Sequence, residues 1–287
     1  MIFGGIEAGG TKWVCAIGSG PGQLDDTVVI PTTNPDETIG RAADFFARRD
    51  GLAAVGVGSF GPVDLRTGRI TTTPKVGWGG IELVDRLRER LDLPVVLDTD
   101  VNAAALGEHR WGAAVGLETF FYVTVGTGIG GGGLVEGRLV HGLLHPEVGH
   151  MRIPHDRDRD PFDGVCPYHG DCLEGLASGR ALEARWGRRA EEIDDEEAWA
   201  LEAEYLALGL VNLVCTVSPQ RIVVGGGVAK RPGLLPLVRR RVCELAAGYV
   251  AAAELEEGID EYIVPPALDD RAGVLGAIEL AREALAS

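Results

Sequence analysis

Positive charge is scarce in this chain of 287 residues. Lys and Arg together number 27 against 43 Asp and Glu, which gives a formal net charge of −16 at pH 7. Nucleic-acid binding that is independent of base sequence depends on a basic surface, so the composition predicts no nucleic-acid partner. An anionic substrate is still allowed, because the backbone N–H groups of a glycine-rich loop can bind phosphate locally.

Long apolar runs and a secretion signal are also missing. No apolar run reaches the roughly 20 residues that a membrane-spanning helix needs, so we expect no membrane partner. The chain starts with MIFGGIEAGGTKW, which has neither the basic nor the apolar segment of a signal peptide. We therefore expect a cytoplasmic protein in a reducing compartment. Neighbouring cysteines bind metal there more often than they form disulfides.

Strand and helix patterns alternate along the chain, which is long enough for two domains. Two apolar segments on either side of a glycine turn, residues 2–8 and 13–17, predict a β-hairpin. Further strands are expected in residues 52–62, 93–100, 119–133 and 221–228. Helices are expected in residues 81–91, 195–217 and 272–285. This alternation indicates an α/β fold with two similar halves that divide near residues 107–118.

Three glycine turns follow strands. The first contains Gly9, Gly10, Thr11 and Lys12, and nearly imitates a P-loop, but a strand follows it where a P-loop requires a helix. A single glycine hairpin is usually only a turn. The other two turns are Gly126-Thr127-Gly128 and Gly225-Gly226-Gly227. Three such turns at strand ends favour a phosphate-binding site, because ligand sites in α/β folds collect where strand ends meet loops.

Two carboxylates lie at the end of the strand predicted in residues 93–100. Asp100 could cap the alanine-rich helix that follows, or it could serve as a catalytic carboxylate at a strand end. Asp98 is its nearest competitor, because alternation along a strand places both side chains on the same face. The residue pattern alone does not choose between them.

One short stretch, residues 145–175, holds four of the six histidines and two of the five cysteines. Cys166, His169 and Cys172 follow one another at intervals of three, and two thiolates with an imidazole suit a tetrahedral Zn²⁺ that needs a fourth ligand. The candidates for that ligand are His141, His145, His150 and His155. The alternative is a surface loop with incidental cysteines. The charged run in residues 155–163 is expected to be a solvated loop.

These motifs resemble the ROK family of sugar kinases and repressors. The resemblance rests on EAGGTK, SFGPVD, TTTPKVGW, TDVNAAALGE, GTGIGGG, PEVGH and CPYHGDCLEG, which occur in the family order over nearly the whole chain. It implies an actin-like ATPase (ribonuclease H-like) fold with two α/β domains flanking a cleft. The domains would be residues 1–110, completed by the C-terminal helix at about 273–287, and residues 111–272, which include the zinc-binding loop 145–175.

Several of the motifs are similar to those of bacterial ROK fructokinases. The implied activity is phosphorylation of a hexose primary hydroxyl by ATP and Mg²⁺, with D-fructose giving fructose 6-phosphate. Glu7 replaces the Asp common in the wider family, and Thr99 replaces the Asn that glucose-type members carry. Both departures fit the fructokinase branch.

The resemblance also assigns roles to single residues. Asp100, in the Asp-x-Asn pattern with Asn102, would be the general base. Asn102, Glu147, His150 and Glu174 would bind the sugar, and the three glycine turns would bind the nucleotide. His150 would be the fourth ligand of a closed, structural zinc site. Loss of that metal is expected to weaken sugar binding more than nucleotide binding, since the glycine turns lie outside the zinc-binding loop.

Other functions remain open at this point. The preferred sugar could be mannose, glucose or an N-acetylhexosamine, because small changes in a pocket discriminate between sugars. A sugar-sensing regulator is the alternative outside the enzyme class, but we expect no DNA-binding module, since the first strand begins at residue 2. A catalytically inactive sugar-binding protein is disfavoured by Asp100 and Lys12. The oligomeric state is open, with a homodimer among the options.

Overall fold

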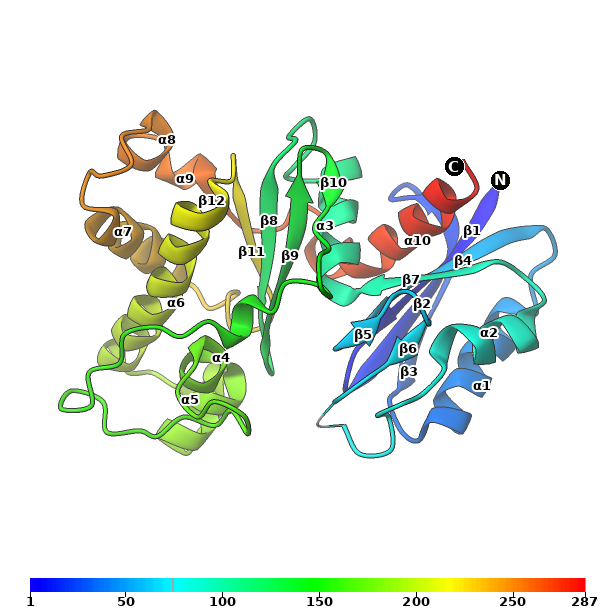
Figure 1. Ribbon diagram of the computed structural model, residues 1–287, viewed down its shortest axis with the longest axis horizontal. Helices are drawn as coiled ribbons and strands as arrows, with labels where there is room; N and C mark the ends of the chain where they lie inside the picture. The colour runs from blue at the N-terminus through cyan, green and yellow to red at the C-terminus, as the bar shows by residue number, and fades with distance from the viewer. Residues whose placement is uncertain (74, 287) are drawn as a thin grey trace. The chain divides into compact units, whose positions relative to one another are not determined.

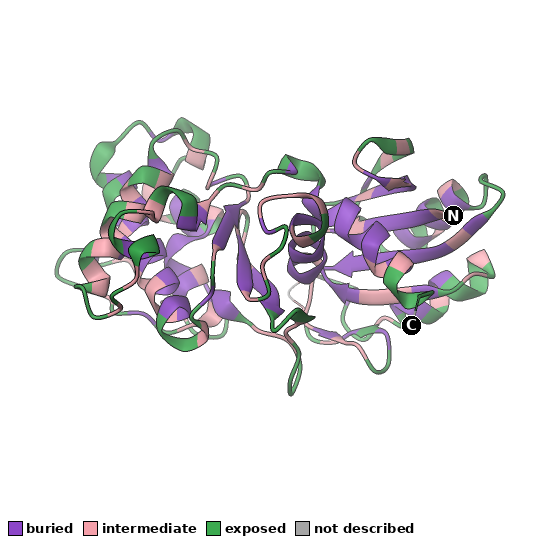
Figure 2. Cartoon of the chain, turned by 90° about the horizontal axis from the view of Figure 1, so that it is seen from above, coloured by how far each residue is buried: buried purple, intermediate pink, exposed green. Residues whose placement is uncertain are grey.

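The computed structural model describes residues 1–73 and 75–286, so that Pro74 of the TTTPKVGW motif lies outside the described residues. The chain divides into two compact units (Figure 1). Unit 1 comprises Met1–Gly116, Leu139–His145 and the chain from Ala267 onward, and unit 2 comprises Leu117–Arg138 and Pro146–Pro266. Each unit is built on one mixed five-stranded sheet whose strands are largely buried (Figure 2).

The sheet of unit 1 has the order β3-β2-β1-β4-β7. Its strands are β1 (Ile2–Ala8), β2 (Lys12–Gly20), β3 (Gln23–Pro31), β4 (Leu52–Ser59) and β7 (Val95–Thr99), and a separate pair is formed by β5 (Val63–Asp64) and β6 (Arg69–Ile70). Strands β1, β4 and β7 run parallel, with Ala8 opposite Ser59 and Ser59 opposite Thr99. Their carboxyl ends therefore lie at one edge, where the first glycine turn and Asp100 follow.

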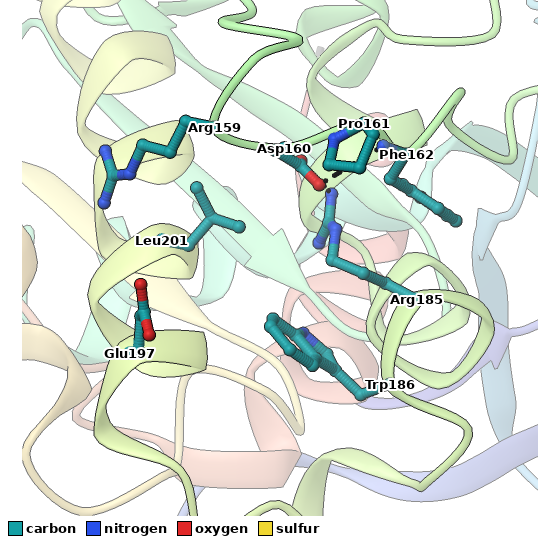
Figure 3. Close-up of a pocket in the computed structure, with 8 residues that line it drawn as sticks. All are labelled: Arg159, Asp160, Pro161, Phe162, Arg185, Trp186, Glu197 and Leu201. Carbon is teal, nitrogen blue, oxygen red and sulfur yellow. Dashed lines mark hydrogen bonds and ion pairs between the residues drawn. The ribbon is translucent and has the colours of Figure 1, made fainter.

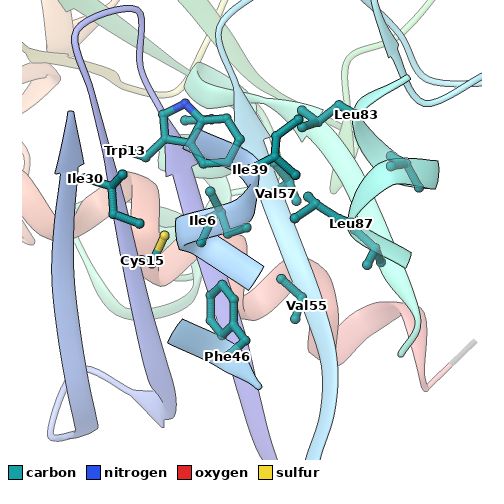
Figure 4. Packing of buried hydrophobic residues seen from close by; sticks show 14 of the residues in the cluster. Ile6, Trp13, Cys15, Ile30, Ile39, Phe46, Val55, Val57, Leu83 and Leu87 are labelled. Atoms are coloured by element: carbon teal, nitrogen blue, oxygen red, sulfur yellow. The ribbon is translucent and has the colours of Figure 1, made fainter. Parts of the chain in front are cut away.

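Helices cover this sheet on both faces. They are α1 (Pro35–Phe46), α2 (Leu83–Leu91), α3 (Asp100–Trp111), η3 (Asp269–Arg271, a 3₁₀ helix) and α10 (Ala272–Ala284). The main apolar core lies between the sheet and helices α1 and α2, where Trp13, Phe46 and Leu87 are fully buried (Figure 4). Helix α1 starts where the Asn34 side chain accepts a hydrogen bond from the Glu37 amide, a side-chain cap of the usual kind.

Helix α10 packs closely against the other face of the same sheet and against α3. A Cβ atom at Gly56 of β4 would lie 1.9 Å from the Ala277 carbonyl oxygen, and one at Gly276 would lie 1.5 Å from the Ala103 carbonyl oxygen. Glycine is required at both positions because no side chain fits between the two backbones. The last helix in the sequence thus completes the unit that the first strand begins.

A buried carboxylate lies next to two of the four places where the chain passes between the units. Glu108 of α3 has no exposed surface. Its Oε2 accepts hydrogen bonds from the amides of Ala113 (2.6 Å) and Ala267 (3.0 Å), and its Oε1 accepts one from Leu268 (2.9 Å). The chain first leaves unit 1 after Gly116 and last returns to it at Ala267. A carboxylate with three backbone donors is well compensated for its burial.

The sheet of unit 2 has the order β10-β9-β8-β11-β12. Its strands are β8 (Phe120–Val125), β9 (Ile129–Val135), β10 (Arg138–Leu139), β11 (Ile222–Gly225) and β12 (Ile263–Val264). An antiparallel pair, β9 and β8, is followed by the parallel strands β11 and β12. In unit 1 the antiparallel pair β2 and β1 is followed by β4 and β7, so the prediction of two similar halves is confirmed.

The helices of unit 2 include the longest in the protein. They are η1 (Val148–His150) and η2 (Ala190–Glu192), both 3₁₀, with α4 (Leu173–Ala177), α5 (Gly179–Trp186), α6 (Glu196–Val217), α7 (Leu234–Ala246), α8 (Ala253–Glu256) and α9 (Ile259–Tyr262).

Helix α6 confirms the helix predicted in residues 195–217. By length and composition alone α6 could cross a membrane, so the statement that no segment is long and apolar enough was wrong. More than half of its apolar window (56%) is buried within the protein, as in a core helix.

Candidate functional site

The first glycine turn joins β1 to β2 and is held by its own backbone. Gly9 N–H donates to the Lys12 carbonyl (3.0 Å), while Thr32 donates from its amide to Thr11 O (2.9 Å) and from its hydroxyl to Gly9 O (2.7 Å). The side chains of Thr11 and Lys12 are exposed. The predicted hairpin turn is therefore fixed in shape and leaves a hydroxyl and an ammonium group available to a ligand.

The structure separates the roles of Asp98 and Asp100. Asp98 is only 4% exposed, and its carboxylate accepts hydrogen bonds from the Thr99 amide (2.7 Å) and from Asn102 Nδ2 (2.8 Å). The helix is capped by Thr99, whose hydroxyl accepts from the Asn102 amide at 3.1 Å. Asp100 is the first residue of α3 and is half-buried. The cap that the sequence offered as an alternative role for Asp100 is thus supplied by Thr99.

The side chain of Asn102 is fully buried. Its amide nitrogen is 2.8 Å from the Asp98 carboxylate and 3.2 Å from His141 Nε2. His141 also contacts Asp98, with 2.9 Å between Nε2 and Oδ2. Sequence reasoning offered His141 only as a metal ligand. The sequence separation of 43 residues left no local signal of this pair.

Glu7 is a second carboxyl group close to Asp100. The pKa of Glu7 is raised to about 7, mainly by burial and also by the negative charge of Asp100, against the lowering effect of the Lys12 ammonium. Its Oε2 atom is buried and has no hydrogen-bond partner in the described parts of the chain. The carboxyl group occupies space left by Gly273, where a Cβ would lie 2.5 Å from Glu7 Cδ. The sequence had singled out Glu7 only as a departure from the family pattern.

The other two glycine turns lie side by side in unit 2. Strands β8 and β11 pair in parallel, with Gly225 opposite Thr124, so residues 126–128 and 225–227 follow the same edge of the sheet. Gly226 has a φ of +94°, and a Cβ there would lie 2.4 Å from the Val125 carbonyl oxygen. Val228 N–H donates to that same carbonyl at 3.0 Å. The structure therefore brings these two turns together, as the strand pattern predicted.

Four side chains of the zinc-binding loop converge on one point. The ligand atoms of His150, Cys166, His169 and Cys172 all lie within 4.8 Å of one another. His150 Nδ1 is 3.6 Å from the sulfur of Cys166 and 3.6 Å from that of Cys172, and His169 Nδ1 is 3.6 Å from Cys166 Sγ. Ligands at zinc's usual distances from sulfur and nitrogen, about 2.3 and 2.05 Å, lie about 3.6 Å apart in a tetrahedron. The donor set and the spacing both fit such an ion.

The other candidates for the fourth ligand have different partners. His141 contacts Asp98, and His145 Nε2 accepts a hydrogen bond from the Val63 amide at 3.2 Å. His155 lies 2.9 Å from the Asp160 carbonyl and 3.3 Å from the Asp171 carboxylate. The ligand that the resemblance selected, His150, is the one that joins the cluster.

The charged run in residues 155–163 is not uniformly solvated, so that interpretation was wrong for His155 and Asp160, which are both buried. The Asp160 carboxylate accepts a hydrogen bond from the Tyr205 hydroxyl (2.6 Å) and pairs with Arg185 (3.1 Å), which also lies over the Phe162 ring. Figure 3 shows Arg185 reaching toward Asp160 in the wall of a cavity of about 340 Å³. This ion pair anchors the loop that carries the cysteines.

Two glutamates flank the metal cluster. Burial raises the pKa of Glu147, the nearby His150 lowers it and the charge of Glu174 raises it. Glu174 accepts hydrogen bonds from the Ile129 amide (3.0 Å) and from Arg180 Nη2 (3.2 Å). Gly179 N–H in turn donates to the Gly126 carbonyl at 2.7 Å.

These contacts link the zinc-binding loop to the turn at residues 126–128, and sequence reasoning missed them. Arg180 was not singled out, although its position six residues after Glu174 was the available signal. Because of this link, a disturbance of the metal cluster reaches the glycine turn as well as the glutamates. The smaller effect of metal loss on nucleotide binding stays a prediction, but the reason for it, that the glycine turns lie outside the loop, does not hold for the turn at residues 126–128.

Comparisons with known proteins agree with these features. The family model described as "ROK family" matches residues 3–284. A fructokinase of Zymomonas mobilis subsp. mobilis is 45% identical over 98% of this chain and 96% of its own length. Among solved structures, the ROK hexokinase of Thermus thermophilus has a TM-score of 0.82 at 31% identity, covering 100% of this chain and 99% of that one. A ROK family glucokinase of Streptomyces griseus, in complex with glucose and AMPPNP, has a TM-score of 0.80 at 27% identity, covering 99% and 100%.

Proposed function

The chain belongs to the ROK family, and from this premise we propose that it is an ATP-dependent fructokinase. The reaction transfers the γ-phosphoryl group of ATP to the primary hydroxyl of D-fructose and yields fructose 6-phosphate and ADP. The cytoplasm, where ATP is available, is the compartment that suits this reaction.

The observation that carries the proposal is the position of Asp100. It stands at the carboxyl end of β7, half-buried, with the capping role taken by Thr99 and the internal polar contacts taken by Asp98. Asp100 accepts the proton of the sugar hydroxyl while the new O–P bond forms and the bond from the γ-phosphorus to the bridging oxygen of ADP breaks. Phosphoryl transfer asks the protein mainly for positioning and charge neutralisation, so one well-placed carboxylate is sufficient.

The nucleotide is assigned to the three glycine turns. Gly10, Thr127 and Gly128 offer backbone N–H groups to the phosphates, while Gly9 and Gly126 shape the two turns by donating to the carbonyls of Lys12 and Gly128. Thr11, Lys12 and Thr127 add hydroxyl and ammonium groups. Gly225–Gly227 approach the adenosine. Mg²⁺ supplies charge neutralisation of the phosphates, with water filling much of its coordination shell.

The sugar is assigned to Glu147, His150 and Glu174, with Asn102 supporting Asp98 from behind. Zn²⁺ in the His150, Cys166, His169 and Cys172 cluster is structural, because four protein ligands leave no open position for a reacting water. With Nδ1 on the metal side, His150 keeps Nε2 for a sugar hydroxyl. Glu174 serves the sugar while its bonds to Ile129 and Arg180 hold it in place.

Fructose is preferred over other hexoses on two grounds. Identity to the fructokinase of Zymomonas mobilis, at 45%, exceeds the 27% identity to the glucokinase of Streptomyces griseus. Thr99 also stands where glucose-type members carry Asn, and its hydroxyl is occupied in capping α3. Thr99 is also only 3% exposed, so its side chain is not presented to a sugar hydroxyl.

A coupled kinase assay with Mg·ATP and a panel of fructose, mannose, glucose and N-acetylhexosamines tests the proposal. We expect the highest kcat/KM with fructose and a loss of about 100-fold or more in kcat for Asp100→Asn, the range for removal of a general base. Preference for another hexose would move the assignment within the kinases. Binding of sugar without any phosphorylation would instead favour a sugar-sensing regulator. Near-normal turnover of Asp100→Asn would exclude Asp100 as the base.

A further inference from the structure

His141 stands in the segment Leu139–His145, which belongs to unit 1 although its neighbours in sequence belong to unit 2. Its ring nitrogen Nε2 is 2.9 Å from Asp98 Oδ2. The Asp98 carboxylate is 5% exposed, whereas the His141 side chain is 34% exposed. The imidazole is therefore fixed at one edge by a buried carboxylate and open at the other.

The hydrogen bonds around Asp98 decide which nitrogen of His141 carries the proton. A carboxylate oxygen can only accept, so the short contact requires Nε2–H as the donor. The opposite tautomer would place a lone pair of His141 Nε2 against the lone pairs of Asp98 Oδ2, with only 2.9 Å between the two atoms. The Asn102 side-chain amide donates to the other carboxylate oxygen, Asp98 Oδ1, and so does not relieve this repulsion. Nδ1 is then an acceptor in the neutral ring and a second donor in the imidazolium, so it can pair with a hydroxyl in either state, and among the described residues it forms no hydrogen bond.

We propose that His141 is a substrate-recognition residue whose Nδ1 binds a ring hydroxyl of the hexose, with Asp98 as the residue that positions it. The proposal rests on the fructokinase function above. Asp98 lies two residues before Asp100, at the same junction between β7 and α3, so the His141 ring is attached to the structure that carries the reacting carboxylate. A hexose has hydroxyls around its whole ring, and it needs partners beyond the group that binds the reacting hydroxyl.

The same contacts have a plainer interpretation, in which His141 only ties the segment to unit 1. That role is already shared, because His145 Nε2 accepts a hydrogen bond from the Val63 amide. A tie requires Nε2 alone, whereas recognition requires Nδ1 as well. The two interpretations therefore differ in what a side chain with only the first nitrogen would do.

Two substitutions separate them. The amide nitrogen of Gln can replace Nε2–H toward Asp98 but leaves nothing in the place of Nδ1, so His141→Gln keeps the tie and removes the acceptor. His141→Ala removes both. Leu143→Ala is the matched control, because Leu143 lies in the same segment and is fully exposed. Thermal melts check that each variant is folded.

The decisive measurement combines these variants with fructose analogues that each lack one hydroxyl or invert one carbon, such as 2,5-anhydro-D-mannitol, D-psicose and D-tagatose. We expect His141→Gln to raise the KM for fructose about 5- to 10-fold, the loss of one hydrogen bond, without changing the KM for ATP. One analogue should lose that factor with the wild type and lose nothing more with His141→Gln. Leu143→Ala should match the wild type throughout.

A fructose KM and an analogue ranking that are unchanged in His141→Gln would overturn the proposal, even if His141→Ala were impaired. Failure of the fructokinase function would look different. If the wild type phosphorylates no sugar but binds fructose in calorimetry, the function falls, and the affinity of His141→Gln for fructose still decides the role of His141. If the wild type binds no fructose, both are overturned.

Discussion

Replacing Glu7 by Gln should make the ligand-free protein more stable at neutral and alkaline pH. The Glu7 carboxyl group is buried beside Asp100, and one of its oxygens has no hydrogen-bond partner among the described residues. Gln has the same shape and carries no charge, so it retains the packing against Gly273 while removing the buried ion.

The magnitude follows from the shift in pKa. The folded-state pKa is about 7 and the ordinary pKa of a Glu side chain is 4.5, so the folded state binds the proton more tightly than the unfolded state. The free energy of unfolding therefore falls as pH rises from about 4.5 to about 7 and then stays constant. A shift of about 2.5 units at about 1.36 kcal/mol per unit corresponds to about 3 kcal/mol. Glu7→Gln should recover most of this above pH 7 and little of it near pH 4.5.

Urea unfolding between pH 5 and 9, without Mg²⁺ or nucleotide, measures the effect. Glu89→Gln is the control, because it removes an exposed carboxylate from the same unit of a chain whose net charge is −16. The stabilisation by Glu7→Gln should exceed that of the control and grow with pH. In an Asp100→Asn background it should shrink, since the charge of Asp100 contributes to the shift. A Gln variant no more stable than the wild type at pH 8 would refute the reasoning.

Three further predictions concern the other parts of the site. Thr127→Val should weaken nucleotide affinity more than fructose affinity in calorimetry, because the exposed Thr127 hydroxyl in the turn after β8 is assigned to the nucleotide. Equal losses would count against the assignment of that turn. Protein purified without chelator should contain about one Zn²⁺ per chain. Cys172→Ser should raise the KM for fructose and also the KM for ATP, since Glu174 links the loop to Ile129. A metal-free protein with full activity would exclude the structural role. The hydrogen bond to Asp98 raises the pKa of His141, so the stabilisation from this pair should be complete below about pH 6.5 and decline as pH rises through the raised pKa. The difference in Tm between the wild type and His141→Ala, which lacks both ring nitrogens, should therefore fall from pH 6 to pH 9, and a difference that does not fall would contradict the prediction.

The parts of the fold that could be predicted from the sequence are those with short-range causes. The first hairpin and α6 follow from apolar periodicity and from a glycine turn or a capping aspartate within a few residues. Strand β3 and helix α7 were not predicted. The outward face of β3 is polar and exposed, and α7 begins after Gly233 without a side-chain cap, so neither has a strong local signal.

The candidate site divides in the same way. Three of the four side chains of the Cys/His cluster were found from their spacing, because Cys166, His169 and Cys172 lie within seven residues of one another. The fourth needed the family resemblance, since four histidines were equally eligible by type. The pairing of His141 with Asp98 depends on tertiary contact between distant segments, as does the burial of Glu7 beneath α10. No pattern along the chain reports such contacts.

Glu108 makes the boundary of unit 1 useful for protein engineering. The amide nitrogens of Ala113 and Ala267 bind the same carboxylate oxygen, so they are no farther apart than the sum of two hydrogen bonds of 2.6 and 3.0 Å. In topological terms, the first exit of the chain from unit 1 and its last return meet at one point. New chain termini can therefore be introduced in unit 2 while both outer ends of that stretch remain tethered. Exchanging residues 117–266 for a related segment would replace the turns at residues 126–128 and 225–227, the segment Leu139–His145 and the zinc-binding loop, while the first glycine turn, Asp100 and α3 stay unchanged.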